Sequence, residues 1–96
     1  MTIEQTLQVH RTNILQLARQ YGARNLRLFG SVARHEERPE SDIDFLVEME
    51  QGRTLLDLIG FSQDLESLLH RKVDVLTDDS LSPYLKERIQ SESRPL

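Results

Sequence analysis

Between Leu26 and Met49 the sequence reads LRLFGSVARHEERPESDIDFLVEM. A short apolar run ends at Gly30-Ser31, and after ten intervening residues two aspartates, Asp42 and Asp44, open a second apolar run. The two runs are typical of sheet strands, and the polar, proline-containing segment between them is typical of an exposed loop. Carboxylates at the start of a strand that enters the core need a physical reason, because burying unpaired charges is costly.

The composition suits one small soluble domain. The chain has 96 residues, of which 38% are hydrophobic and 29% charged, and its formal net charge is -4. We expect a single domain over residues 1–96, because a chain of this length builds only one core. The acidic balance argues against direct nucleic-acid binding, which needs a basic face. The absence of cysteine excludes a disulfide framework and a thiolate metal site.

The sequence shows no targeting segment. Glu4, His10 and Arg11 occupy the region where a signal peptide needs an apolar stretch. The most apolar window, TLLDLIGF, contains Asp57 and is far shorter than the roughly 20 residues that span a bilayer. We therefore expect a cytoplasmic protein with no membrane partner.

Hydrophobic periodicity predicts alternating helices and strands. The expected elements are a helix from Ile3 to Tyr21 capped by Thr2 and stopped at Gly22, a strand at 25–29, a helical turn at 31–34, a strand at 42–49, a helix at 55–69 capped by Thr54, a strand at 72–77, and a helical tail from Ser82 that frays over 91–95. This order predicts a small α/β or α+β fold, a mixed sheet of three or more strands with helices packed on one face. The pattern leaves the order and direction of the strands open.

The two aspartates of the second strand point to a metal. Asp42 and Asp44 share a face, because side chains two residues apart in a strand project to the same side. Neighbouring carboxylates repel each other, and a hard divalent cation that prefers oxygen ligands would offset this. Asp74 lies between Val73 and Val75 in another expected strand. If the two strands are neighbours, three carboxylates face one pocket.

The Gly30-Ser31 corner predicts the other half of a site. A glycine at a strand end lets the backbone approach a ligand closely. A serine that opens a helical turn presents a hydroxyl and free backbone N–H groups, which bind phosphate. A phosphate site facing metal-binding carboxylates describes a nucleoside triphosphate with Mg²⁺. The reaction class that follows is phosphoryl or nucleotidyl transfer.

Together, these motifs resemble the signature of the minimal nucleotidyltransferases of the DNA polymerase β superfamily, over residues 26–76. The shared pattern is an apolar strand, Gly-Ser, a spacer, Asp-apolar-Asp and a later third acid. Members of this group are commonly encoded beside a HEPN-domain protein, in pairs similar to toxin–antitoxin modules. Characterised members are antitoxins that transfer AMP from ATP to a tyrosine of the HEPN ribonuclease. The resemblance thus implies the nucleotidyltransferase fold, a protein adenylyltransferase with ATP as substrate, and a HEPN toxin as partner in a heteromeric complex.

The resemblance assigns roles to six residues: Gly30, Ser31, Arg34, Asp42, Asp44 and Asp74. The glycine and the serine would hold the triphosphate, and the arginine would reach a phosphate. The three aspartates would be catalytic and would ligate a pair of Mg²⁺ ions, and the third would also help to take the proton from the attacking hydroxyl. His35 departs from the family pattern, because many members have glycine there. This difference leaves the shape of the loop and its nucleotide contacts in doubt.

Two other functions stay open. The chain could neutralise a partner by stoichiometric binding through apolar helix faces, without catalysis. It could also transfer a nucleotide to a small molecule, although the related antibiotic nucleotidyltransferases add a substrate domain for which this length leaves no room. A haloacid-dehalogenase phosphatase is excluded, because its aspartates follow an apolar strand, whereas here Phe45-Leu46-Val47 comes after them.

Overall fold

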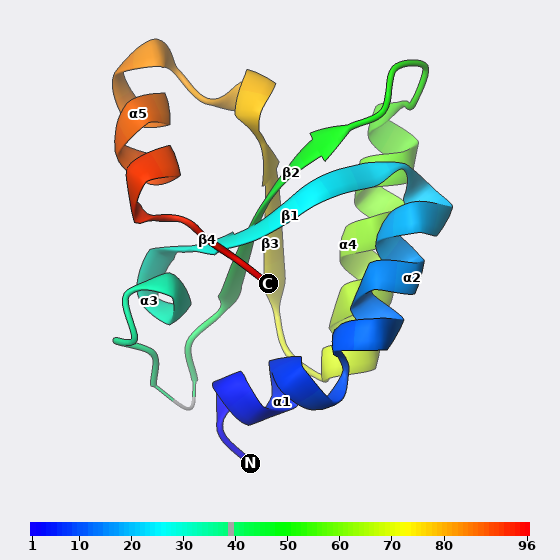
Figure 1. Ribbon diagram of the computed structural model, residues 1–96. Coiled ribbons are helices and arrows are strands. Elements are labelled where there is room, and N and C mark those ends of the chain that lie inside the picture. Colours follow the sequence, from blue (N-terminus) through cyan, green and yellow to red (C-terminus); the bar gives the residue numbers. More distant parts are fainter. Residues whose placement is uncertain (39) are drawn as a thin grey trace.

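The computed structural model describes residues 1–38 and 40–96 and contains a four-stranded mixed sheet flanked by helices (Figure 1). The elements are α1 Ile3–Val9, α2 Arg11–Tyr21, β1 Ala23–Phe29, α3 Gly30–Ala33, β2 Ile43–Met49, α4 Leu55–Leu69, β3 Val73–Thr77, the 3-10 helix η1 Asp78–Ser80, α5 Pro83–Glu92 and β4 Arg94–Pro95. The strand order is β3-β2-β1-β4, with β1 antiparallel to β2 and β4 and with β2 parallel to β3. The predicted mixed sheet is confirmed. In the part of the chain that the structure describes, no helix is long and apolar enough to cross a bilayer.

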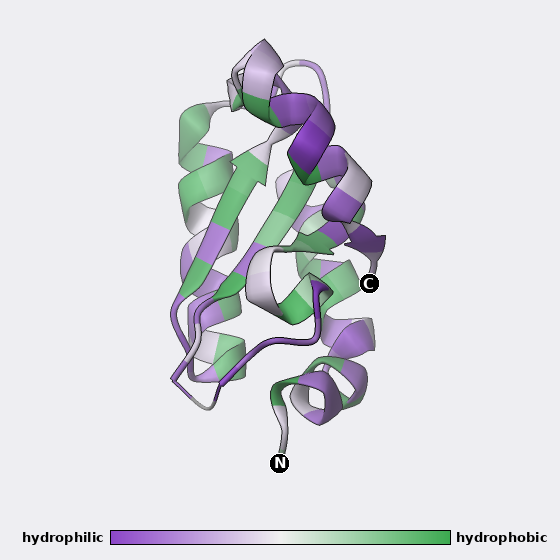
Figure 2. Ribbon diagram, turned by 90° about the vertical axis from the view of Figure 1, so that its left-hand side faces the viewer, coloured by the Kyte–Doolittle hydropathy of each residue, from purple (hydrophilic) through white to green (hydrophobic). Residues whose placement is uncertain are grey.

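The two faces of the sheet differ in their cover. Helices α2 and α4 pack on one face, whereas α3 and α5 lie on the other side (Figures 1 and 2). The prediction that the helices pack on one face therefore holds for α2 and α4 but not for α3 and α5. Ile43, Phe45 and Val47 of β2 are fully buried in the core under α2 and α4. Burying each such side chain contributes roughly 1.5–3 kcal/mol. Asp44 and Leu46 alternate with them and therefore face the α3 and α5 side, where Figure 2 shows hydrophilic segments interrupting the strands.

The N-terminal helix is divided, which corrects the prediction of one helix from Ile3 to Tyr21. His10, whose ψ is 8°, lies between the end of α1 and the start of α2 and caps both helices. Leu7 and Ile14 are both buried and keep the same helical phase across the break, so periodicity does not reveal it. The predicted cap at Thr2 is confirmed as a full capping box.

A glycine in the middle of α4 serves the packing of α2 against α4. A Cβ added at Gly60 would lie 2.7 Å from Cε1 of Tyr21. The Tyr21 ring packs beside Phe61 with ring centroids 6.2 Å apart, and its hydroxyl donates a hydrogen bond of 2.5 Å to Asp64. The ring is therefore held at both ends, and Gly60 leaves the space that it occupies.

Replacing Gly60 with alanine is expected to destabilise the protein by about 1–3 kcal/mol through this overpacking. Helix propensity alone would change the stability in the opposite direction, because it favours alanine over glycine by about 1 kcal/mol. Denaturant unfolding of Gly60→Ala beside Ser67→Ala, an exposed position of the same helix, measures the difference. A Gly60→Ala protein as stable as the wild type would show that Tyr21 moves freely.

The prediction that residues 91–95 fray is wrong, because residues 91–92 end α5 and Arg94–Pro95 form the strand β4. Arg94 of β4 pairs with Leu28 of β1, and the Leu96 N–H donates to the Leu26 carbonyl at 3.3 Å. The free edge of β1 offers unpaired backbone groups to this segment. The end of the chain therefore lies beside the strand that leads into Gly30.

Candidate active site

Two of the predicted aspartates lie side by side on neighbouring strands. The parallel register of β2 and β3 pairs Asp44 with Asp74, and the antiparallel register of β1 and β2 pairs Phe29 with Asp44. The adjacency of strands that the sequence left open is therefore settled. Asp44 lies between the third acid on one side and the end of β1, where Gly30 begins, on the other.

The acidic surroundings perturb Asp44. Burial of its carboxyl raises the pKa of Asp44 from 3.8 to about 6, and the nearby charges of Asp74 and Asp42 and a hydrogen bond with Asp74 act in the same direction. The charge of Arg34 opposes them. The three acids gather negative charge, and Asp44 at their centre keeps its proton up to about pH 6, so the cluster favours added positive charge.

Gly30 fits the turn between β1 and α3 for two independent reasons. Its φ is +73°, in the left-handed region that glycine adopts at little cost. A Cβ at this position would also overlap Oδ2 of Asp44. The backbone that leads into Ser31 therefore passes directly beside the Asp44 carboxyl. The close approach to a ligand, which the sequence predicts for this glycine, stays a prediction.

Asp42 and Arg34 are held by other charges at the margin of the site. Asp42 Oδ2 lies 3.9 Å from Nζ of Lys72. Arg34 donates from Nε to Glu36 at 3.1 Å and from Nη1 to Glu92 at 3.2 Å, and these hydrogen bonds, that with Glu36 foremost, raise the pKa of Arg34. Glu92 belongs to α5, and no local pattern in the sequence connected that helix with this site.

The residues present fit a hard divalent cation by their chemistry. Asp42, Asp44 and Asp74 offer only carboxylate oxygens, the ligands that Mg²⁺ prefers. The raised pKa of Asp44 shows that its charge is poorly compensated by protein groups. Among residues 1–38 and 40–96, no three acidic or histidine side chains are gathered around one point as a complete ligand set. The site thus offers suitable donor atoms, but the carboxylates are not arranged around one point as metal ligands.

His35, the departure from the family pattern, adopts the backbone conformation that favours glycine. Its φ is +58°, in the left-handed region, where a residue with a Cβ carries a cost of about 1–2 kcal/mol. Its Nδ1 lies 3.5 Å from Oε1 of Glu4. The loop after α3 therefore keeps a glycine-like path, with histidine in contact with the N-terminal helix.

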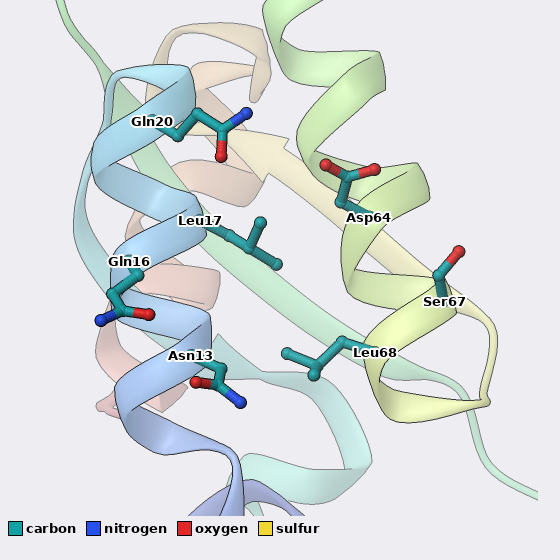
Figure 3. Close-up of a pocket in the computed structure, with 7 residues that line it drawn as sticks. All are labelled: Asn13, Gln16, Leu17, Gln20, Asp64, Ser67 and Leu68. Atoms are coloured by element: carbon teal, nitrogen blue, oxygen red, sulfur yellow. The ribbon is translucent and has the colours of Figure 1, made fainter.

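A separate groove lies between α2 and α4, with a volume of about 400 Å³. Figure 3 shows Leu17 and Leu68 pointing toward each other across it, with polar side chains around them. Its lining residues are Asn13, Gln16, Leu17, Gln20, Asp64, Ser67 and Leu68. Because α2 and α4 cover the face of the sheet opposite to Asp44, this groove is not part of the aspartate site.

Known proteins are similar in sequence to this chain over most of its length. Residues 12–96 match the nucleotidyltransferase domain family. The chain is 44% identical over 80 residues to MJ0435 of Methanocaldococcus jannaschii, to which protein adenylyltransferase activity is attributed, covering 83% of this chain and 86% of that protein. It is 30% identical over 92 residues to the protein adenylyltransferase MntA of Thermococcus cleftensis, covering 96% and 93%.

Solved structures share the fold. A minimal nucleotidyltransferase superposes with a TM-score of 0.87 at 44% identity, covering 96% of this chain and 94% of that one. A chain in the complex of a tri-AMPylated Shewanella oneidensis HEPN toxin with an MNT antitoxin superposes with a TM-score of 0.68 at 23% identity, covering 92% and 69%. The second likeness shows the fold alone. The family match and the near-complete relatives show that this chain belongs to the nucleotidyltransferase domain family and is a nucleotidyltransferase.

Proposed function

We propose that this chain is an antitoxin that transfers AMP from ATP, with Mg²⁺, to a tyrosine hydroxyl of a partner HEPN ribonuclease toxin and thereby neutralises it. The observation that carries the proposal is the pairing of Asp44 with Asp74 beside the close approach of Gly30. The protein adenylyltransferases MJ0435 and MntA support it because they match this chain over nearly their full lengths. The HEPN toxin complex supports the nature of the partner.

The turn at the end of β1 would hold the nucleotide. The backbone N–H groups and the hydroxyl at Ser31 would bind phosphate oxygens, and Gly30 lets that backbone lie close to the acidic cluster. Arg34 would exchange a glutamate partner for a phosphate. Asp42, Asp44 and Asp74 would hold Mg²⁺, which supplies neutralisation of the negative charge on the phosphate oxygens when bound.

The chemical step is an in-line displacement at the α-phosphorus of ATP. The tyrosine oxygen forms a bond to this phosphorus, the bond from phosphorus to the oxygen that bridges to the β-phosphate breaks, and pyrophosphate leaves with the bonding electrons. The phenolic proton passes to a carboxylate, and we assign that role to Asp74. Its side chain is exposed to solvent, where an incoming tyrosine can reach it.

A protein acceptor agrees with the size of the fold. The described residues pack into one sheet with its helices, which supports a single domain over residues 1–96. Asp74 is exposed, so the hydroxyl group of an acceptor protein could reach it from outside the fold. With ATP as co-substrate and a ribonuclease toxin as partner, the reaction would take place in the cytoplasm.

Incubation with the HEPN partner, ATP and Mg²⁺, followed by intact-mass spectrometry of the partner, tests the proposal. We expect additions of AMP on a tyrosine of the partner, and we expect them to vanish when EDTA removes the metal. Asp79→Asn should transfer AMP as the wild type does, since Asp79 is an exposed acid on η1 outside the cluster. A partner that is neutralised while its mass stays unchanged would support stoichiometric binding instead.

A further inference from the structure

We propose that Arg94, close to the C-terminus, is a positioning residue for nucleotide binding. It ties the carbonyl of Val32 in α3 to the carboxylate of Glu4 in α1, and so holds the turn that carries Ser31 beside the acidic cluster. The proposal deepens the proposed function and rests on it for the identity of the ligand. It assigns a task to a residue that lies in a different element from every residue of the acidic cluster.

Helix α3 cannot hold its own shape. It has only four residues, and the first turn of a helix is unfavourable without support from packing. Its conformation is bounded by left-handed backbone on both sides, at Gly30 with φ +73° and at His35 with φ +58°. The hydrogen bonds that close the turn run from the N–H groups of Arg34 and His35 to the carbonyls of Gly30 and Val32, at 3.1 and 3.2 Å.

Arg94 supplies support from outside the turn. Its Nη2 donates to the Val32 carbonyl at 3.2 Å and also to Oε1 of Glu4. The backbone of Arg94 is fixed by its pairing with Leu28 in β1. Its Nε is buried without a hydrogen-bond partner among the described residues, which carries a free-energy cost. The guanidinium therefore lies where Nη2 can make its two contacts, and not where all its donors are satisfied.

The carboxylate of Glu4 joins three parts of the chain. It accepts from Arg94 and lies 3.5 Å from Nδ1 of His35, the residue that follows α3 by two positions. Glu4 is itself in the first turn of α1, whose start is fixed by the capping box at Thr2. A second tie, from Arg34 to Glu92, joins the other side of the turn to α5. The N-terminal helix, the turn and the C-terminal strand are thus linked by charge-assisted hydrogen bonds.

Loss of the contacts made by Arg94 would weaken the binding of ATP more than the binding of the acceptor protein. Ser31 lies on α3, whereas Asp44 and Asp74 lie on β2 and β3 and stay in place when α3 moves. A small displacement of groups that bind the triphosphate is enough to lower affinity strongly. We therefore expect weaker ATP binding with little change in the KM for the acceptor protein.

The test uses Arg94→Met, which keeps the side-chain stem and removes the donors, with Arg94→Lys as the conservative variant. Arg19→Met is the matched control, because Arg19 is an exposed arginine of α2. Calorimetry measures the affinity for a non-hydrolysable ATP analogue in the presence of Mg²⁺. We expect Arg94→Met to bind the analogue about 10-fold more weakly or worse. The lysine should restore part of the affinity, and the control should bind as the wild type does.

Amide hydrogen exchange gives a readout that needs no nucleotide. In Arg94→Met, the N–H groups of Arg34 and His35 should exchange about 10-fold faster or more at a temperature well below unfolding, and the Arg19→Met control should not differ from the wild type. Unchanged exchange at these two amides would overturn the proposal. If Arg94→Met fails to fold, Glu4→Gln, which weakens the same tie without touching β4, must show the same local acceleration.

The two readouts separate the two proposals. If the wild type binds no ATP analogue, the proposed function fails, and exchange at the Arg34 and His35 amides still decides whether Arg94 holds the turn. If the wild type binds the analogue and Arg94→Met binds it equally well, the role of Arg94 in nucleotide binding is overturned and the proposed function stands.

Discussion

Replacing Asp44 with asparagine is expected to abolish adenylyl transfer and, at the same time, to stabilise the protein at neutral pH. The transfer rate should fall by about 10³-fold or more, because the side chain at the centre of the acidic cluster loses the negative charge that would hold Mg²⁺. The shape of the side chain is kept, and its amide can donate to the neighbouring carboxylate of Asp74.

The expected gain in stability follows from the raised pKa of Asp44. A carboxyl group whose pKa is higher in the folded protein binds its proton more tightly there, so it favours folding at low pH. That contribution is lost as the pH rises from the unfolded value of 3.8 through the folded value of about 6. Because the group is partly exposed and screened by solvent, we expect the ionised carboxylate to cost about 1–2 kcal/mol at pH 7.

Urea unfolding between pH 4 and pH 8, in the presence of EDTA, measures this effect. The difference in unfolding free energy between Asp44→Asn and the wild type should increase from pH 4 through the folded pKa of about 6 and level off about one pH unit above it. Taking the difference removes the contributions of the other acids, and Asp79→Asn serves as the neutral control. Added Mg²⁺ should stabilise the wild type and leave Asp44→Asn unchanged. A variant less stable than the wild type at pH 7 would contradict the cause given for the pKa shift.

The acidic half of the site could be predicted from the sequence because its signals are local. The spacing of Asp42 and Asp44 predicts that both share one face of a strand, although β2 begins one residue after Asp42. Gly30-Ser31 marks the end of another strand. The position of Asp74 required one further fact, the parallel pairing of β2 and β3, which no local pattern contains. The sequence could therefore name the third acid but could not place it.

The contacts that support the turn after β1 could not be predicted, because they join distant parts of the chain. Arg94 and Glu4 are 90 residues apart, and Arg34 and Glu92 are 58 apart. The sequence Ser-Glu-Ser-Arg-Pro at 91–95 has the composition of a frayed terminus, yet its first two residues end α5 and Arg94–Pro95 pair with the edge of β1. Propensity near the chain end was overridden by tertiary contacts that exist only once the sheet has formed.

Replacing Gly30 with alanine is expected to destabilise the protein by about 2–5 kcal/mol and to abolish transfer. Two independent costs add together. An alanine at φ +73° is strained by about 1–2 kcal/mol. Its methyl group also overlaps Oδ2 of Asp44, and relieving that overlap by moving a packed group costs about 1–3 kcal/mol.

Gly52 provides a control that separates the two costs. Its φ is +88°, and a Cβ there would meet nothing within 4 Å, so Gly52→Ala reports the backbone strain alone. Denaturant unfolding of both variants should show that Gly30→Ala costs at least about 1 kcal/mol more. In an Asp44→Ala background the overlap is gone, and the cost of Gly30→Ala should fall to that of Gly52→Ala. Equal costs for the two alanines in the wild-type background would mean that the turn does not press against Asp44. The close approach of the Gly-Ser turn to the carboxylates would then have to arise only when the nucleotide binds.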